Sequence, residues 1–117
     1  MRCAAAGLLL VLAAAGVAGA QTVSERLNDY PTAVRADYVF ACMAANGQGQ
    51  DVLRKCACSI DHIASVLPYA AYVEAETVLS LQLTGGERMS IFRTSAPAKA
   101  LVAELRRAQA EAEIVCF

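Results

Sequence analysis

The chain has 117 residues, of which 57% are hydrophobic and 18% are charged, and its formal net charge is −1. A chain of this length forms one domain, and a nearly balanced charge excludes the clustered basic surface that nucleic-acid binding requires. Of its five cysteines, four lie beyond the N-terminal segment that contains Cys3, and an even number in a short exported chain indicates a disulfide framework.

The first twenty residues have the pattern of a cleaved signal peptide. Arg2 precedes an apolar run over residues 4–17, and Ala18-Gly19-Ala20 supplies the small-x-small site that signal peptidase accepts. The run is diluted by alanine and glycine, whereas a spanning helix needs about 20 strongly apolar residues. We therefore expect cleavage after Ala20 and a mature periplasmic protein without a membrane span. The loss of Arg2 then makes the charge one unit more negative.

Helical spacing of apolar residues runs through the rest of the chain, after a flexible lead-in predicted over residues 21–31. No segment alternates with period two, so no strand is expected. The pattern predicts a single all-α domain over residues 32–117, a small disulfide-stapled bundle of four main helices plus one short helix. The main helices are predicted over about residues 32–45, 51–67, 68–83 and 95–115, and the short one over about residues 87–93.

Four cysteines remain after the leader is removed, namely Cys42, Cys56, Cys58 and Cys116. Cys56 and Cys58 lie two positions apart on one predicted helix, so their side chains point to nearly opposite sides and are poorly placed to bond to each other. Cys42 and Cys116 then each take one member of that pair, and both pairings are open. Either one ties the first and last helices to the second and contributes about 3–4 kcal/mol per bridge.

The chain contains no recognisable catalytic motif. His62 is its single histidine, and no serine or cysteine beside it forms a nucleophile pattern. Cys58 and His62 lie four residues apart, which suits a shared metal on one helix face, although a disulfide is the stronger interpretation of Cys58 in an oxidising compartment. The attachment motif of a c-type haem is absent. We expect a protein that is not an enzyme and has no organic cofactor.

Three carboxylates form the candidate metal site. The turn at Leu67 and Pro68 predicts an antiparallel helix pair, in which residues equidistant from the turn face each other. Asp61 lies six residues before Leu67 and Glu74 six after Pro68, so their carboxylates are expected to approach each other. Glu76, about 200° round the helix from Glu74, is the third candidate ligand. Such oxygen ligands suit a hard cation, a lanthanide or calcium, and the simpler alternative is a pair of solvated acids.

Four segments of the chain together resemble a known family. They are residues 37–48 (DYVFACMAANGQ), 56–61 (CACSID), 72–77 (YVEAET), and 108–113 (AQAEAE) with the closing Cys116-Phe117. Over residues 37–117 the chain is similar to small periplasmic four-cysteine proteins of the landiscernin type. These proteins are associated with quinoprotein (PQQ-dependent) alcohol dehydrogenase and lanthanide-uptake systems.

This resemblance implies a non-enzymatic periplasmic protein that binds a lanthanide or a similar hard cation, as an accessory of quinoprotein-dependent alcohol or methanol oxidation. It also implies a periplasmic dehydrogenase or cytochrome as partner, and a homodimer bridged by the metal. The alternative function is a metal-independent interaction module, an adaptor or folding aid for a periplasmic dehydrogenase. Its contacts would come from aromatic side chains, namely Tyr30, Tyr38, Tyr69 and Tyr72.

Overall fold

The computed structural model describes residues 28–117, so the predicted signal peptide and most of the lead-in lie outside the described residues. Within residues 28–117 every regular element is helical, which confirms the all-α prediction of four main helices and a short one. The elements are α2 (Thr32–Asn46), α3 (Gln50–Val66), α4 (Tyr69–Thr84), the 3₁₀ turn η1 (Glu87–Met89), α5 (Ser90–Thr94) and α6 (Ala96–Cys116).

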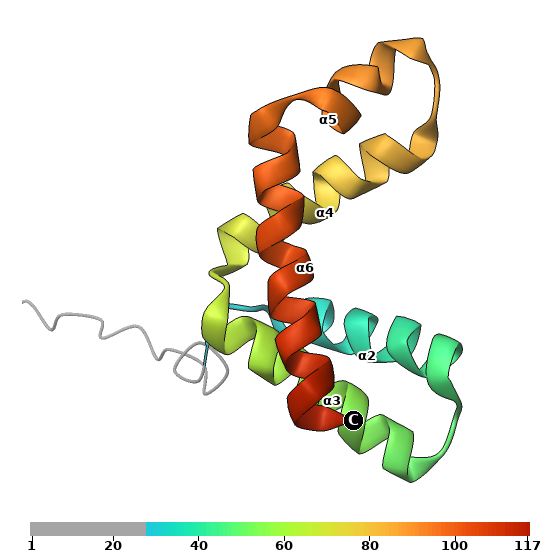
Figure 1. Ribbon diagram of the computed structural model, residues 1–117. Coiled ribbons are helices and arrows are strands. Elements are labelled where there is room, and N and C mark those ends of the chain that lie inside the picture. Colours follow the sequence, from blue (N-terminus) through green and yellow to red (C-terminus); the bar gives the residue numbers. More distant parts are fainter. Residues whose placement is uncertain (1–27) are drawn as a thin grey trace, which may run out of the picture.

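The last and longest helix, α6, holds the bundle together. Figure 1 shows α6 (red) running between the hairpin of α2 and α3 and the arch of α4 and α5, and it packs on α3, α4 and α5. Leu105, Ala108 and Ala112 recur at helical spacing on α6 and are buried in the core with Ile60 and Ile63 of α3. The two small alanines let neighbouring helices come close to α6.

Tyr30 belongs to the core although it precedes the first described helix. It is only 1% exposed, and its hydroxyl donates a hydrogen bond of 2.9 Å to the carbonyl oxygen of Leu67. The ring centre of Tyr30 lies 5.3 Å from that of Tyr69 and 5.1 Å from that of Tyr72. The lead-in predicted over residues 21–31 therefore ends in an anchored residue, which the polar character of that segment did not indicate.

The chain bends outward between α3 and α4. Leu67 has extended backbone because the ring of Pro68 disfavours the helical region for the residue before it, and Pro68 itself has a ψ of 146°. Asp29 accepts the backbone N–H of Tyr69 at 2.8 Å and so satisfies one free donor at the start of α4. In Figure 1, α4 leaves this bend away from α3 and packs on α6 instead. The side-by-side antiparallel pair that the sequence predicted at this turn does not form.

Two disulfides attach the outer helices to α3. Cys42–Cys56 joins α2 to α3, and Cys58–Cys116 joins α3 to the end of α6, which settles the pairing that the sequence left open. Cys56 is fully buried whereas Cys58 is exposed, as expected for positions two apart on a helix. These bridges are characteristic of an oxidising, extracytoplasmic compartment. Between residues 28 and 117, no helix has the length and apolar character needed to cross a membrane.

Helix α2 lies at the edge of the bundle. It packs on α3, and none of its residues is fully buried. It ends at Gly47, whose φ of 120° is unfavourable for other residues and whose N–H donates to the carbonyl oxygen of Met43 at 2.9 Å. Because few other elements pack on α2, the protein surface has a hollow on each side of this helix.

Candidate functional site

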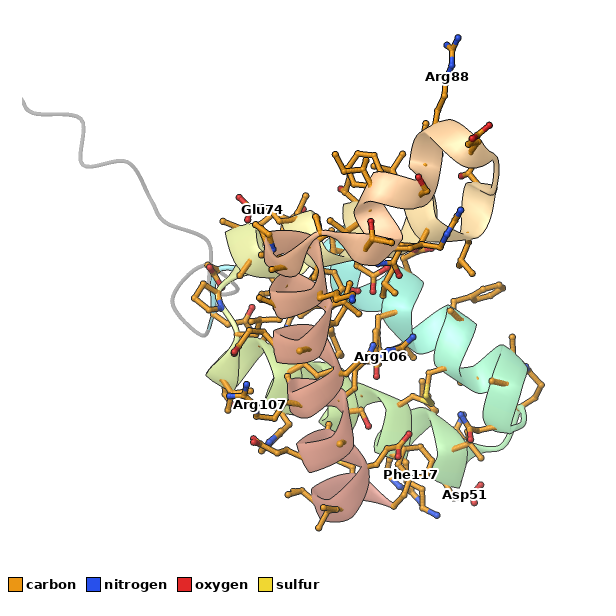
Figure 2. The ribbon with its side chains drawn as sticks, turned by 45° about the horizontal axis from the view of Figure 1, so that its top comes forward. Asp51, Glu74, Arg88, Arg106, Arg107 and Phe117 are labelled. Carbon is orange, nitrogen blue, oxygen red and sulfur yellow. A yellow bond between two sulfur atoms is a disulfide. The ribbon has the colours of Figure 1, made fainter. Side chains whose placement is uncertain are left out.

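The three predicted metal ligands lie in different places. Asp61 on α3 accepts a hydrogen bond of 3.4 Å from Nη1 of Arg35 on α2. Glu74 is exposed, and Figure 2 shows it on the outer edge of α4. Glu76 faces another way, as its spacing from Glu74 predicts, and is half-buried in a hollow. Asp61 lines the hollow between α2 and α3, whereas Glu74 lies on the exposed side of α4. Within residues 28–117, no three His, Cys, Asp or Glu side chains form a group able to hold a metal.

A hollow of about 950 Å³ separates α2 from α4 and α6, with part of α3 as its floor, and we call it the acidic hollow. Three carboxylates line it, each from a different helix: Asp37 from α2, Glu76 from α4 and Glu113 from α6. The phenols of Tyr38 and Tyr72 lie among them, and no lysine, arginine or histidine of the described residues is part of the lining. The acidic hollow therefore offers oxygen atoms and negative charge.

The titrating groups of the acidic hollow influence one another. Burial raises the pKa of Tyr72 to about 12, and the negative charge of Glu76 adds to the rise. Burial, then the charges of Glu113 and Glu76, raise the pKa of Tyr38. Burial also raises the pKa of Glu76, against a smaller opposite effect of Arg106. A positive charge placed among these groups would favour the ionised form of each acid.

Two basic side chains stand beside the acidic hollow without lining it. Figure 2 shows Arg106 on the flank of α6 that faces α2, and its Nη1 donates to Oε1 of Gln109 at 3.2 Å. Nζ of Lys55 lies 5.4 Å from the ring centre of Phe117, which forms part of the lining. Against the three lining carboxylates, these two charges leave the region with a negative balance.

Ser59 lies at the floor of the acidic hollow, and sequence reasoning missed it. The residue is only 2% exposed, and its Oγ is buried without a hydrogen-bond partner in the described part of the chain. Leaving such a hydroxyl unpaired costs about 1–3 kcal/mol, so buried hydroxyls normally have a partner. Because this Oγ is buried, it is also out of reach of a molecule held in the acidic hollow.

The other side of α2 carries an apolar hollow of about 450 Å³, formed by side chains of α2 and α3. Val39 and Leu53 line it, and Phe40, which is 79% exposed, stands at its edge. The ion pair of Arg35 and Asp61 borders the same hollow. This second surface is suited to apolar contact rather than to ion binding.

The remaining candidate residues have structural roles. Cys58 is bonded to Cys116 and so does not share a metal with His62, whose Nε2 lies 3.7 Å from Oε2 of Glu111 on α6. None of the four tyrosines considered for partner contacts is an exposed residue. Two are buried and two are half-buried: Tyr30, Tyr72, Tyr38 and Tyr69.

No known protein family, curated protein or solved structure matches this chain. Fold and site together define a small helical protein with two disulfides and an acidic hollow at its surface. The functional argument therefore starts from the residues of that hollow.

Proposed function

We propose that this protein is a periplasmic, non-enzymatic binding protein that holds a hard cation, a lanthanide or calcium, in the acidic hollow. In line with the family resemblance, it acts as an accessory of quinoprotein-dependent alcohol or methanol oxidation. The observation that carries the proposal is that Asp37, Glu76 and Glu113, from three helices, line one hollow that has no basic lining residue among residues 28–117. The signal-peptide pattern of residues 1–20 supports the periplasmic location.

The donor atoms of the acidic hollow favour a hard cation over a soft one. Side chains with carboxylate, phenol and amide groups line the hollow, and hard cations prefer oxygen ligands of these kinds. Cys42 also lines the hollow, but its sulfur is bonded to Cys56 and offers no thiolate to a soft metal. Negative charge at the opening also speeds the approach of a cation.

The rim of the acidic hollow leaves room for a partner. Asp37 and Glu113 are exposed, so their carboxylates remain accessible while Glu76 is half-buried. A second copy that shares the metal, or a periplasmic dehydrogenase or cytochrome that receives it, can approach from this side. An open site of this kind suits a carrier that delivers its ion.

Calorimetric titration of the protein purified from the periplasm tests the proposal, with La³⁺ and Ca²⁺ as separate probes. We expect binding of La³⁺ at micromolar concentration or tighter, and stabilisation of about 2.7 kcal/mol at an ion concentration one hundred times the dissociation constant. Glu76→Gln should weaken binding about tenfold or more, whereas Glu74→Gln, two residues away and outside the hollow, should leave it unchanged. Absence of both heat and thermal stabilisation would refute the proposal.

The apolar hollow favours a second candidate function, the metal-independent interaction module. An exposed aromatic side chain beside an apolar surface, here Phe40, is typical of a protein contact site. A purified periplasmic dehydrogenase captured in the presence of a chelator, and lost with Phe40→Ala, would support this function. Capture that requires metal and Glu76 would support the cation-binding function instead.

A further inference from the structure

We propose that two copies of this chain associate through the apolar hollow, with Phe40 of each copy seated in the hollow of the other. This dimer goes beyond the cation-binding function and does not depend on it, because the apolar hollow and the acidic hollow lie on different sides of α2. It forms without metal and leaves the acidic hollow of each copy open.

The apolar hollow lies along a face that α2 and α3 form together. The apolar lining residues of each helix recur at intervals of three and four, which is the spacing of helices in bundles. They are Ala36, Val39 and Met43 on α2, and Leu53, Ala57 and Ile60 on α3. An antiparallel helix pair with such a face is half of a four-helix bundle, and a second pair can cover the side left open.

Phe40 widens the apolar stripe of α2 beyond its contact with α3. Its side chain is 79% exposed at the edge of a hollow of about 450 Å³. Pockets of this size hold drug-sized molecules, so the hollow has room for one phenylalanine ring. Each copy therefore carries both a protruding ring and a hollow beside it. Because the two halves of a two-fold interface are the same surface, a surface with both parts can complement itself.

The register of the two helices places Phe40 beside a small residue of α3. The Cys42–Cys56 bridge, with its Cα atoms 5.8 Å apart, sets Cys42 level with Cys56. The helices of this hairpin run antiparallel (Figure 1), so Phe40 lies about level with residues 57 and 58. The small side chain of Ala57 lets another helix come close. A two-fold axis at this point makes the α3 helices of the two copies cross antiparallel.

The charges on either side of Ala57 favour a second copy over an unrelated protein. Arg54 lies three residues before Ala57 and Asp61 four after it, so all three share one flank of α3, and both charged residues are exposed. When two α3 helices cross antiparallel at Ala57, Arg54 of each copy faces Asp61 of the other. The side chain of Asp61 is 62% exposed beside its 3.4 Å contact with Arg35, so its carboxylate can accept a second arginine.

Sedimentation equilibrium of the protein purified from the periplasm, in EDTA, tests the proposal. We expect a monomer–dimer equilibrium with a dissociation constant in the micromolar range, because the surface is small. Phe40→Asp should weaken the dimer about a hundredfold or more, since each interface loses two central aromatic side chains. Leu83→Asp is the matched control: Leu83 on α4 is 85% exposed and lies outside the hollow, so the dimer should be unchanged.

Charge reversal tests the arrangement of the two copies. Arg54→Asp and Asp61→Arg each bring like charges together at two places in the dimer, so each variant alone should associate about tenfold more weakly. A mixed dimer of the two variants has opposite charges at both places, and its affinity should return to within about threefold of the wild type. Native mass spectrometry of the mixture counts the mixed dimer, because the two variants differ in mass.

The outcomes separate this proposal from the other functions. A protein that stays monomeric, a dimer that EDTA dissociates, or a dimer that Phe40→Asp leaves intact would each overturn it. A monomer that captures a purified periplasmic dehydrogenase, and loses it with Phe40→Ala, would show that another protein occupies the hollow. Failure of the mixed pair to recover would overturn the antiparallel crossing at Ala57. Absence of La³⁺ binding would remove the cation-binding function and leave the dimer standing.

Discussion

The two sides of α2 differ in chemistry although they belong to one helix. Asp37 and Tyr38 line the acidic hollow, while Val39 and Phe40 line the apolar hollow, because successive residues of a helix are rotated by about 100°. No residue of α2 is fully buried, so packing in the core restricts the choice of few of its side chains. A peripheral helix attached by one bridge can thus present two separate binding surfaces.

Removal of the Cys58–Cys116 bridge should cause the largest loss of stability. It should also change the acidic hollow and leave the apolar hollow unchanged. The cysteines lie 58 residues apart, and loss of this loop closure costs about 4 kcal/mol in the chain-entropy description. Cys58→Ser with Cys116→Ser should also release Glu113 and Phe117 and so weaken cation binding. Urea denaturation and La³⁺ titration measure the two effects, and a hydrophobic dye reports on the apolar hollow, which we expect to be unchanged. A parallel change in the apolar hollow would contradict this separation.

Removal of the Cys42–Cys56 bridge should damage both surfaces at a smaller cost in stability. Its 14-residue separation corresponds to about 3 kcal/mol. Because α2 packs mainly on α3, Cys42→Ser with Cys56→Ser should loosen the whole helix, and hydrogen exchange of the amides of α2 measures this. Undiminished protection of those amides would show that side-chain packing alone holds α2.

Glu76→Gln should have the smallest effect on stability, and in the stabilising direction. Burial raises the pKa of Glu76 in the folded protein, so the folded state binds this proton more tightly than the unfolded state does. Stability therefore falls as pH rises through the folded pKa, and glutamine removes that loss. We expect Tm at pH 7 without metal to rise by on the order of a few degrees, together with weaker cation binding. Thermal denaturation from about pH 4 to pH 7 measures this.

The control for this prediction is Glu74→Gln, which makes the same chemical change on the exposed side of α4. It should match the wild type in both Tm and La³⁺ affinity. A lower Tm for Glu76→Gln would show that the carboxylate stabilises the fold, and the expected opposition between stability and binding at this position would then be wrong.

The helices and the set of bridged cysteines could be predicted from the sequence because both depend on local patterns. Apolar spacing set the helical ranges, and the two-residue separation of Cys56 and Cys58 excluded one of the three pairings. The bend at Pro68 was harder to predict, because the extended backbone there sends α4 towards α6. Tyr30, which packs at that bend, lies in a polar segment without periodicity.

The acidic hollow could be predicted only in part. Glu76 was among the candidates because it lies near the turn in the sequence, but Asp37 and Glu113 come from helices that precede and follow it by about 40 residues. That these residues line one hollow depends on how α2, α4 and α6 cross, which no local pattern specifies. Likewise, the unpaired state of Ser59 emerges only when the helices around it are in place.

The attachment of both bridges to one short stretch of α3 has a consequence for oxidative folding. An isomer with the partners exchanged would join Cys42 to Cys58 and Cys56 to Cys116, and α3 would have to rotate by about 200° to present them. That rotation would expose Ile60 and Ile63, which are completely enclosed in the native protein. The exposed apolar side chains make the scrambled isomer less stable than the native protein. Thiol–disulfide exchange therefore converts it to the native pairing.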